Sequence, residues 1–483
     1  MKNNYWIEDK LLIFKPEFNE ELINYYDIIN KYKKVMFSNY NEPLIAIKIN
    51  NIPNIKCYEY YVNSKFNKEI DLSNNINLTH LYLGDYYNNK INLTNNINLT
   101  HLNFGKYFNK QIDLSNNLNL THLTLRDCFN EKINLTNNIN LTHLTIICYF
   151  NQEIDVSSNI KLTHLSLGNI FNQEIDLSNN INLTHLTLRY CFNKKIDLSN
   201  NINLTYLNLG NFNQEIDLSN NINLNVLILR NFNQEINLSN NINLTYLTFG
   251  YYFNTEIDLS NNINLTHLTL GCKFNKKIDL SNNINLTHLT LGDLNQEIYL
   301  SNNINLTHLT FRNLIQKIDL SNNINLKHLT FEGDEYSEIV LSTNINLTHL
   351  TFESDLQQEI DLSNNINLKH LTFAGDVQQE IVLSNNINLT HLTFLCGCNK
   401  EIDLSNNINL THLTFGWNFN HKIFIPLNVK SLNMYCCNNQ YIIDNLHNNI
   451  EELTIFNNAL NLDNLPNSIK KIYIKRYTKE INK

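Results

Sequence analysis

The feature that most constrains this chain is a repeat close to N-L-T-H-L-T-L-G-x-x-F-N-Q-E-I-D-L-S-N-N-I, which begins near Asn77 and continues to about residue 423. Its fourth position occurs seventeen times, from His80 to His412, at steps of 21 or 20 residues. The missing residue always falls just before Phe-Asn, which makes that segment a loop. Self-similarity at a fixed short period predicts one continuous solenoid and argues against several globular domains.

Each repeat contains two short segments in which apolar and polar residues alternate, His-Leu-Thr-Leu and Glu-Ile-Asp-Leu. Alternation with a period of two predicts half-buried strands. Ser-Asn-Asn is expected to close one corner, because Asn tolerates left-handed backbone angles and bonds its own main chain. We therefore predict a mainly β, right-handed solenoid of about 17 regular turns with two short parallel strands per turn. The expected core consists of Leu81, Leu83, Ile91, Leu93, Ile97, Leu99 and their equivalents.

The ends of a solenoid expose its core, so atypical terminal segments should cover them. Residues 1–39 lack the repeat, and Phe18, Leu22, Tyr25 and Ile29 follow the spacing of one amphipathic helix. Residues 40–69 resemble a degenerate first turn, residues 70–423 hold the regular repeats, and residues 424–483 hold irregular repeats and a C-terminal cap.

Composition excludes several classes of function. Asp plus Glu is 45 against 36 for Lys plus Arg, and a net charge of −9 disfavours nucleic acid as a partner. The first ten residues have no apolar signal-peptide region and no run of 18 apolar residues occurs, which predicts an intracellular, cytoplasmic chain that does not enter a membrane. Nine irregularly placed Cys residues favour reduced thiols over a disulfide framework.

The segment Leu78-Thr79-His80-Leu81-Tyr82-Leu83, followed by Asn88, resembles the leucine-rich repeat signature L-x-x-L-x-L. The turn length resembles the shortest class of that superfamily. Phe108-Asn109-Lys110-Gln111-Ile112 is similar to the FNIP repeats of amoebae and their giant DNA viruses, although this chain has Glu, Lys or Gln where most of those repeats have Pro. The resemblance implies a scaffold for protein interaction.

Fourteen of the seventeen turns carry His at the fourth position, while Tyr206, Val226 and Tyr246 interrupt this His column. Stacked imidazoles suggest metal binding, but the neighbouring outward column is mostly Thr, a poor ligand. A structural ladder of neutral His and Thr is the favoured interpretation, and we assign no metal site and no cofactor. No nucleophile or paired carboxylate accompanies any His on its own strand, so no catalytic residue is assigned.

Two further columns are interpreted as structural. The Asn that follows Phe, as in Asn88 and Asn109, is expected to form an inward ladder of amides, and the preceding Phe to fill the core. Six consecutive turns lack that aromatic, and five of them carry Phe at the end of the first strand, which indicates compensation of volume at a shared core position.

The loops that follow the first strand, which we call the variable loop edge, differ most between turns, and such loops are where repeat proteins bind partners. One stretch is acidic, whereas other turns have Arg or aromatic residues. The candidate partner-binding residues are Glu332, Asp334, Glu353, Asp355, Asp376, Arg126, Arg189, Arg230, Tyr251 and Trp417. The same pattern would also arise without any partner if one ancestral repeat had diverged in sequence and was then duplicated again.

The sequence thus favours a non-enzymatic scaffold that binds another protein, one of a host cell if the chain is viral. A substrate-recruiting adaptor for a ubiquitin ligase is the alternative, and it requires residues 1–39 to engage a ligase subunit. Two other hypotheses remain open: a metal-binding His column, and a chain that arose by duplication and has no specific partner. The sequence leaves the oligomeric state open.

Overall fold

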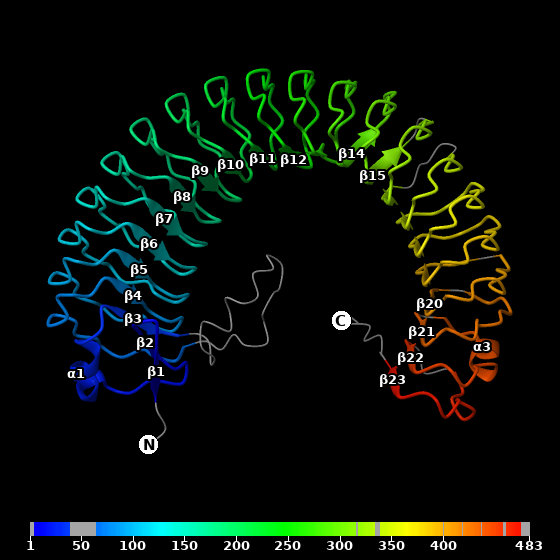
Figure 1. Cartoon of the computed structure of the whole chain (residues 1–483), viewed down its shortest axis with the longest axis horizontal. Helices are drawn as coiled ribbons and strands as arrows, with labels where there is room; N and C mark the ends of the chain where they lie inside the picture. Colours follow the sequence, from blue (N-terminus) through cyan, green and yellow to red (C-terminus); the bar gives the residue numbers. More distant parts are fainter. Residues whose placement is uncertain are drawn as a thin grey trace, which may run out of the picture. The chain divides into compact units, whose positions relative to one another are not determined.

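The computed structural model describes residues 4–38, 64–314, 317–333, 339–398, 400–417, 419–435, 437–456 and 460–474. The chain divides into two units, Met1–Leu244 and Thr245–Lys483, and each is a parallel β-solenoid. Within each unit the strands lie on one side of the coil, and loops and corners complete each turn (Figure 1). The chain makes about 20 turns, because irregular segments at the ends pair with the strands and add to the 17 regular turns expected.

The first unit begins with a hairpin. Strands β1 (Tyr5–Glu8) and β2 (Leu11–Phe14) are antiparallel, and β3 (Lys34–Phe37) pairs in parallel with β2 and then with β4 (His80–Tyr82). One strand per repeat then follows, each parallel to the last: β5 (His101–Asn103), β6 (His122–Leu125), β7 (His143–Ile146), β8 (His164–Leu167), β9 (His185–Leu188), β10 (Tyr206–Leu209) and β11 (Val226–Leu229).

The single amphipathic helix expected in residues 1–39 is wrong. Between β2 and β3 the chain forms only a 3-10 helix (Leu22–Asn24) and one helical turn, α1 (Tyr26–Ile29). Two short strands serve the end of the array better than a helix, because β3 satisfies the backbone groups that β4 would otherwise expose as a sheet edge. Most of the turn expected at residues 40–69 lies outside the described residues, and the proposed domain bounds remain a prediction.

The second unit continues the same arrangement, with every strand parallel to its neighbour. Its strands are β12 (Tyr246–Phe249), β13 (His267–Thr269), β14 (His288–Leu294), β15 (His308–Leu314), β16 (His328–Phe331), β17 (His349–Phe352), β18 (His370–Phe373), β19 (His391–Phe394), β20 (His412–Phe415), β21 (Ser431–Met434), β22 (Glu452–Ile455) and β23 (Lys471–Ile474), with helix α3 (Gln440–Asp444) before β22. The register pairs equivalent residues, for example His308 with His328.

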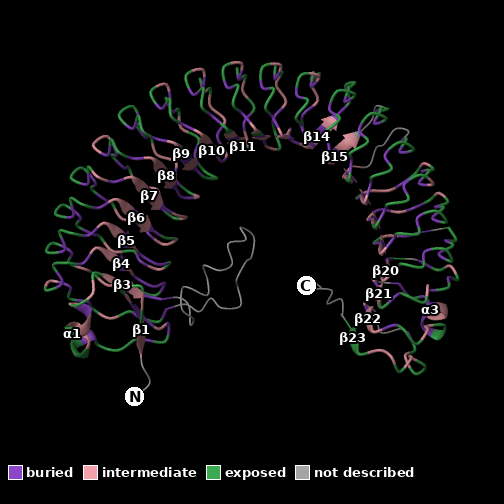
Figure 2. Ribbon diagram, in the orientation of Figure 1, coloured by how far each residue is buried: buried purple, intermediate pink, exposed green. Residues whose placement is uncertain are grey.

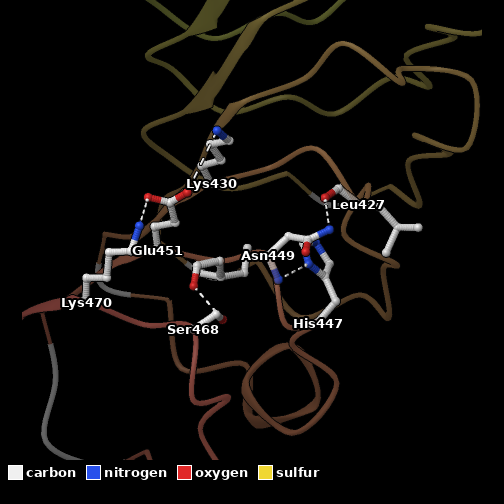
Figure 3. A network of polar contacts seen from close by, with 8 residues as sticks. Leu427, Lys430, His447, Asn449, Glu451, Ser468 and Lys470 are labelled. Atoms are coloured by element: carbon white, nitrogen blue, oxygen red, sulfur yellow. Dashed lines mark hydrogen bonds and ion pairs between the residues drawn. The ribbon is translucent and has the colours of Figure 1, made fainter.

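Polar contacts fix the last turns of this unit (Figure 3). The His447 Nε2 atom donates to the Pro426 carbonyl at 2.9 Å, so its Nδ1 accepts from the Asn449 backbone N–H at 3.2 Å. The Asn449 amide in turn donates to the Leu427 carbonyl at 2.9 Å. These bonds tie successive irregular turns together where the repeat has lost its regular corner.

The core lies inside each turn (Figure 2). Leu123 and Leu125 of β6 and Phe129 of the following loop are at most 1% exposed, which confirms the Phe before Asn as core. In a turn with two aromatic residues, the Phe249 and Phe253 rings stack with centroids 3.9 Å apart. The two positions are therefore in contact, as the volume compensation inferred from the sequence requires.

The second strand expected in each turn does not form. In the described Ile-Asp-Leu segments the only ladder contact outside the named strands is an isolated bridge between Asp71 and Asn92. The Asp side chain turns the backbone instead, since the Ser115 backbone N–H donates to Asp113 Oδ1 at 2.9 Å. This backbone hydrogen bond lowers the pKa of the Asp113 carboxyl.

The corner is also built differently from the expectation. The second Asn of Ser-Asn-Asn is buried, and the Asn96 Nδ2 group donates to the Leu72 carbonyl at 3.0 Å and the Asn75 carbonyl at 2.8 Å. In the described residues, positive φ among non-glycine residues occurs elsewhere, so left-handed Asn does not close the corner. Because the Asn96 amide fills the inside of the corner, Ile97 points out and is 54% exposed, which corrects its assignment to the core.

Candidate interaction site

The outward face of the sheet carries the His column. Consecutive imidazole rings stack almost in parallel, with centroids 4.1 Å apart for His288 and His308 and 4.2 Å apart for His308 and His328. Many of the rings also contact the Thr that precedes them in the sequence; for example, Thr307 Oγ1 lies 2.9 Å from His308 Nδ1. The predicted structural ladder of His and Thr is therefore present in the second unit, and the same contacts recur in the first.

The Thr hydroxyl determines which ring nitrogen carries the proton. Thr307 Oγ1 donates its single hydrogen to the Thr287 carbonyl at 3.1 Å, so His308 Nδ1 must donate to Thr307 Oγ1. The lone pair of the neutral ring is consequently on Nε2, which faces outward. Burial, and then repulsion from neighbouring imidazoles, lowers the pKa of His308 to about 4.

Parallel stacking works against a metal site in this column. A metal ion binds imidazole at about 2.0–2.1 Å along the nitrogen lone pair, in the plane of the ring. Lone pairs of rings stacked 4.2 Å apart run side by side and do not converge on one point. Among the described residues no group of three or more His, Cys, Asp or Glu side chains is placed to hold a metal ion.

The acidic stretch of the variable loop edge is partly engaged in the backbone of the next turn. Asp355 Oδ1 accepts from the Asp376 backbone N–H at 2.7 Å, and Asp376 Oδ1 accepts from the Gly397 backbone N–H at 2.6 Å. Each carboxylate thus keeps a second oxygen outside this ladder. Glu353, two residues before Asp355 in the sequence, is exposed, which leaves its charge for a partner.

Glu332 is less accessible than the sequence suggests. Its carboxylate lies 3.2 Å from Arg312 Nε, and burial raises its pKa although Arg312 opposes the shift. Arg312 is not among the candidate residues, although it lies in the variable loop edge one turn before Glu332. Asp334 lies outside the described residues.

The Arg and aromatic candidates fall in both units. Arg126, Arg189 and Arg230 belong to the first unit, and all three are exposed. The Arg230 guanidinium carbon lies 5.9 Å from the centroid of Tyr190, a residue that is 50% exposed and was missed as a candidate. The sequence does offer a signal for Tyr190, because it is an aromatic residue directly after the candidate Arg189 in the variable loop edge.

In the second unit, Tyr251 and Trp417 are 48% and 45% exposed. The Lys273 ammonium lies 5.7 Å from the Tyr251 ring and 3.7 Å from Asp293, so a cation already covers part of that ring. The structure therefore brings the acidic candidates of the second unit together on consecutive turns, while Arg126, Arg189 and Arg230 belong to the other unit.

The ladder of amides expected after each Phe is present but is not inward. The Asn130 backbone N–H donates to Asn109 Oδ1 at 2.9 Å, and Asn109 is exposed. The buried amide column is the one at the Ser-Asn-Asn corner. No helix in the described part of the chain has the length and apolar content needed to cross a membrane.

No family model matches this chain, and no curated protein matches it. Among solved structures it is similar to CroV588, described as a novel circular LRR protein, with 30% identity, 98% of this chain and 80% of that chain covered, and a TM-score of 0.57. The functional domain of InlJ from Listeria monocytogenes, which includes a cysteine ladder, is 24% identical over 73% of this chain and 72% of that one, with a TM-score of 0.49. The plant peptide hormone receptor RGFR1 in complex with RGF2 is 16% identical over 84% of each chain, with a TM-score of 0.49.

Proposed function

Because this chain belongs to the leucine-rich repeat superfamily, we propose that it is a non-enzymatic scaffold that binds a protein partner through its variable loop edge and the outward face of its sheet. The observation that carries the proposal is the contrast between turns. Strands and corners repeat with nearly identical contacts, whereas the loops differ in charge and aromatic content. A rigid coil that holds different side chains at fixed intervals is suited to recognising one extended protein surface.

The acidic stretch favours a partner with basic side chains. The carboxylates of Glu353, Asp355 and Asp376 lie in loops of successive turns of one unit. The hydrogen bonds from Asp376 and Gly397 hold two of these carboxylates in fixed positions. Pre-positioned charges favour fast and selective association with a basic surface more than they add affinity.

The test compares two variants with equal changes of charge. Glu353→Lys with Asp355→Asn and Asp376→Asn removes the acidic stretch, while Asn retains an oxygen that can accept the backbone hydrogen bonds. The control, Glu359→Lys with Asp361→Asn and Asp403→Asn, makes the same changes in the Ile-Asp-Leu segments, where Asn already occurs naturally at Asn92.

Proximity labelling in the native cell is the measurement, with intact protein as the reference. We expect the loop variant to label its partners at least about tenfold less than the intact protein does, and the control to label them to the same extent as the intact protein. Equal labelling by all three proteins would remove the acidic stretch from the proposal. A host-cell partner, an intracellular location and a particular closeness to FNIP repeats are further parts of this proposal.

A further inference from the structure

A strip of half-exposed aliphatic side chains runs along the Ser-Asn-Asn-Ile corners of the second unit. Each member is between 47% and 67% exposed, and none belongs to the variable loop edge or to the sheet. We call this the Ile strip, and it consists of Ile263, Ile284, Ile304, Ile324, Ile345, Ile366, Ile387, Ile408 and Leu427. At its end, the Leu427 side chain points away from the polar contacts of the last turns (Figure 3).

The strip is held rigidly. The Asn that follows each Ile donates from Nδ2 to the carbonyl of the Ile one turn earlier, for example from Asn325 to Ile304 at 3.0 Å. On the other side of the strip, Asn322 donates to the Ser301 carbonyl at 3.4 Å. Two columns of fixed amides therefore border the Ile side chains, so little conformational entropy would be lost when this surface binds.

The strip carries no charge. Its bordering columns in the second unit hold Asn, with Thr at residue 343, whereas the equivalent strip of the first unit contains Lys161. The chain as a whole has a net charge of −9, so two copies repel each other over most of their surface. An uncharged face is where two such copies can meet without that repulsion.

The size of the strip matches what a stable pair of molecules buries. One isoleucine side chain exposes about 120 Å² of apolar surface, so nine half-exposed side chains leave about 500 Å². Interfaces are about 57% apolar, and this apolar area therefore corresponds to about 900 Å² in total. A standard interface buries about 800 Å² on each partner. The strip is thus as large as the largest apolar patch on a typical monomer, about 300–600 Å², and such patches are often functional.

The occupant is best identified as a second copy of the chain. A two-fold interface requires each surface to complement itself, and a strip of identical side chains at one fixed spacing does so in both copies. Beside the C-terminal end of the uncharged strip lies a groove of about 900 Å³, in which Ile408, Phe424 and Leu427 lie among charged residues such as Glu401, Asp403 and Lys422, and Phe424 is 79% exposed. We propose that the Ile strip is a homotypic interface, through which two copies of this chain associate independently of any partner on the variable loop edge.

The experiment measures mass as a function of concentration for the full chain, by light scattering after size exclusion and by sedimentation equilibrium from about 1 to 200 µM. We expect the wild type to form dimers. The variant Ile304→Lys, Ile324→Lys and Ile345→Lys should dimerise at least about 100-fold more weakly, because three cations would face three cations. If the charged variant fails to fold, a milder variant with Thr at the same three positions takes its place. Thr keeps a β-branched side chain at each position, and this variant should weaken association about tenfold.

The control adds the same charge to exposed apolar residues outside the strip and outside the groove beside it, Tyr252→Lys, Tyr299→Lys and Val340→Lys, and its dimerisation should stay within about threefold of wild type. Dimerisation of the wild type should not weaken between 50 and 500 mM salt, because the side chains of the Ile strip carry no charge. A wild type that is monomeric throughout, or dimers that survive the Lys and Thr changes in the strip, would overturn the proposal. Loss of dimers in the control as well would place the interface elsewhere, and a strip covered only by a different protein would leave the purified chain monomeric.

Discussion

Removing alternate imidazoles from the His column should make the fold less sensitive to acid. The perturbation is His308→Tyr, His349→Tyr and His391→Tyr, three positions separated by His residues that remain. Tyr is the replacement that the chain itself tolerates, since the Tyr206 ring stacks on its His neighbour with centroids 5.7 Å apart. The variant therefore preserves the stacked column and removes three groups that gain a proton in acid.

The sign of the effect follows from the direction of the pKa shifts. Burial, and then neighbouring imidazoles, lowers the pKa of each of His308, His349 and His391 to about 4 in the folded chain. In the unfolded chain the value is about 6.5, so the unfolded chain binds more protons between these two values. The stabilisation is complete above about pH 6.5 and is lost progressively as the pH falls towards 4.

Between pH 7.5 and 5.0 a shift of this size weakens folding by about 2 kcal/mol for each His in a dry site. Water reaches these half-buried rings and reduces the effect to about 1 kcal/mol each, or about 3 kcal/mol for three. At a urea dependence of about 3 kcal/mol per M, the difference corresponds to about 1 M in the midpoint.

The assay is urea denaturation followed by far-ultraviolet circular dichroism at pH 7.5 and 5.0. The wild-type midpoint should fall more than the midpoint of the Tyr variant, and the two proteins should be similar at pH 7.5. Carboxyls such as that of Asp319, whose pKa is lowered by its hydrogen bonds to Ser321, remain ionised at pH 5.0 in both proteins and cancel in the comparison. An equal loss of stability in both proteins would refute the role of the stacked imidazoles.

Three other predictions concern the interior and the ladder. Asn323→Ala removes amide bonds to two buried carbonyls and should cost about 2–3 kcal/mol in urea denaturation, against at most about 1 kcal/mol for the exposed Asn325→Ala. Combining Phe352→Leu with Leu356→Phe restores core volume, so the double variant should lose less than about 1.5 kcal/mol of unfolding free energy, and less than Phe352→Leu alone loses. A double variant less stable than the single variant would contradict a core position shared by the two side chains. Nitrogen-15 NMR at pH 7.5 should find the column imidazoles protonated at Nδ1, and protonation at Nε2 would contradict the Thr hydrogen bonds.

The sequence predicts the parts of this fold in which equivalent residues pair directly. The period, the strand beginning at each His, the stacked imidazoles and the buried Phe column follow from one register, because a side chain that is buried in one turn is buried in the next. The Ile-Asp-Leu segment has the same alternation but no strand. Its Asp bonds the backbone two residues later, as Asp113 does with Ser115, and this local bond ends the extended stretch before it can pair.

The candidate site was predicted less completely, because charge in a loop indicates exposure but not the bonds that a side chain makes. Asp355 and Asp376 look like free carboxylates in the sequence, yet each accepts a backbone N–H of the following turn. The partner of such a bond is about 21 residues away and in a loop of variable sequence. Only the coordinates of consecutive turns bring the two groups together.

The corner isoleucines show why alternation alone assigns burial poorly outside strands. Ile97 and Leu99 are two residues apart, which in a strand would place them on the same face, yet Leu99 is 0% exposed and Ile97 54%. The buried Asn96 amide between turns accounts for the difference, because it bonds two carbonyls inside the corner and turns the next side chain outward. The fold therefore does not require an apolar residue there, and Asn448 occupies the equivalent exposed position near the end of the chain. An aliphatic side chain at this corner gains little from folding, and association with another molecule is what would bury it.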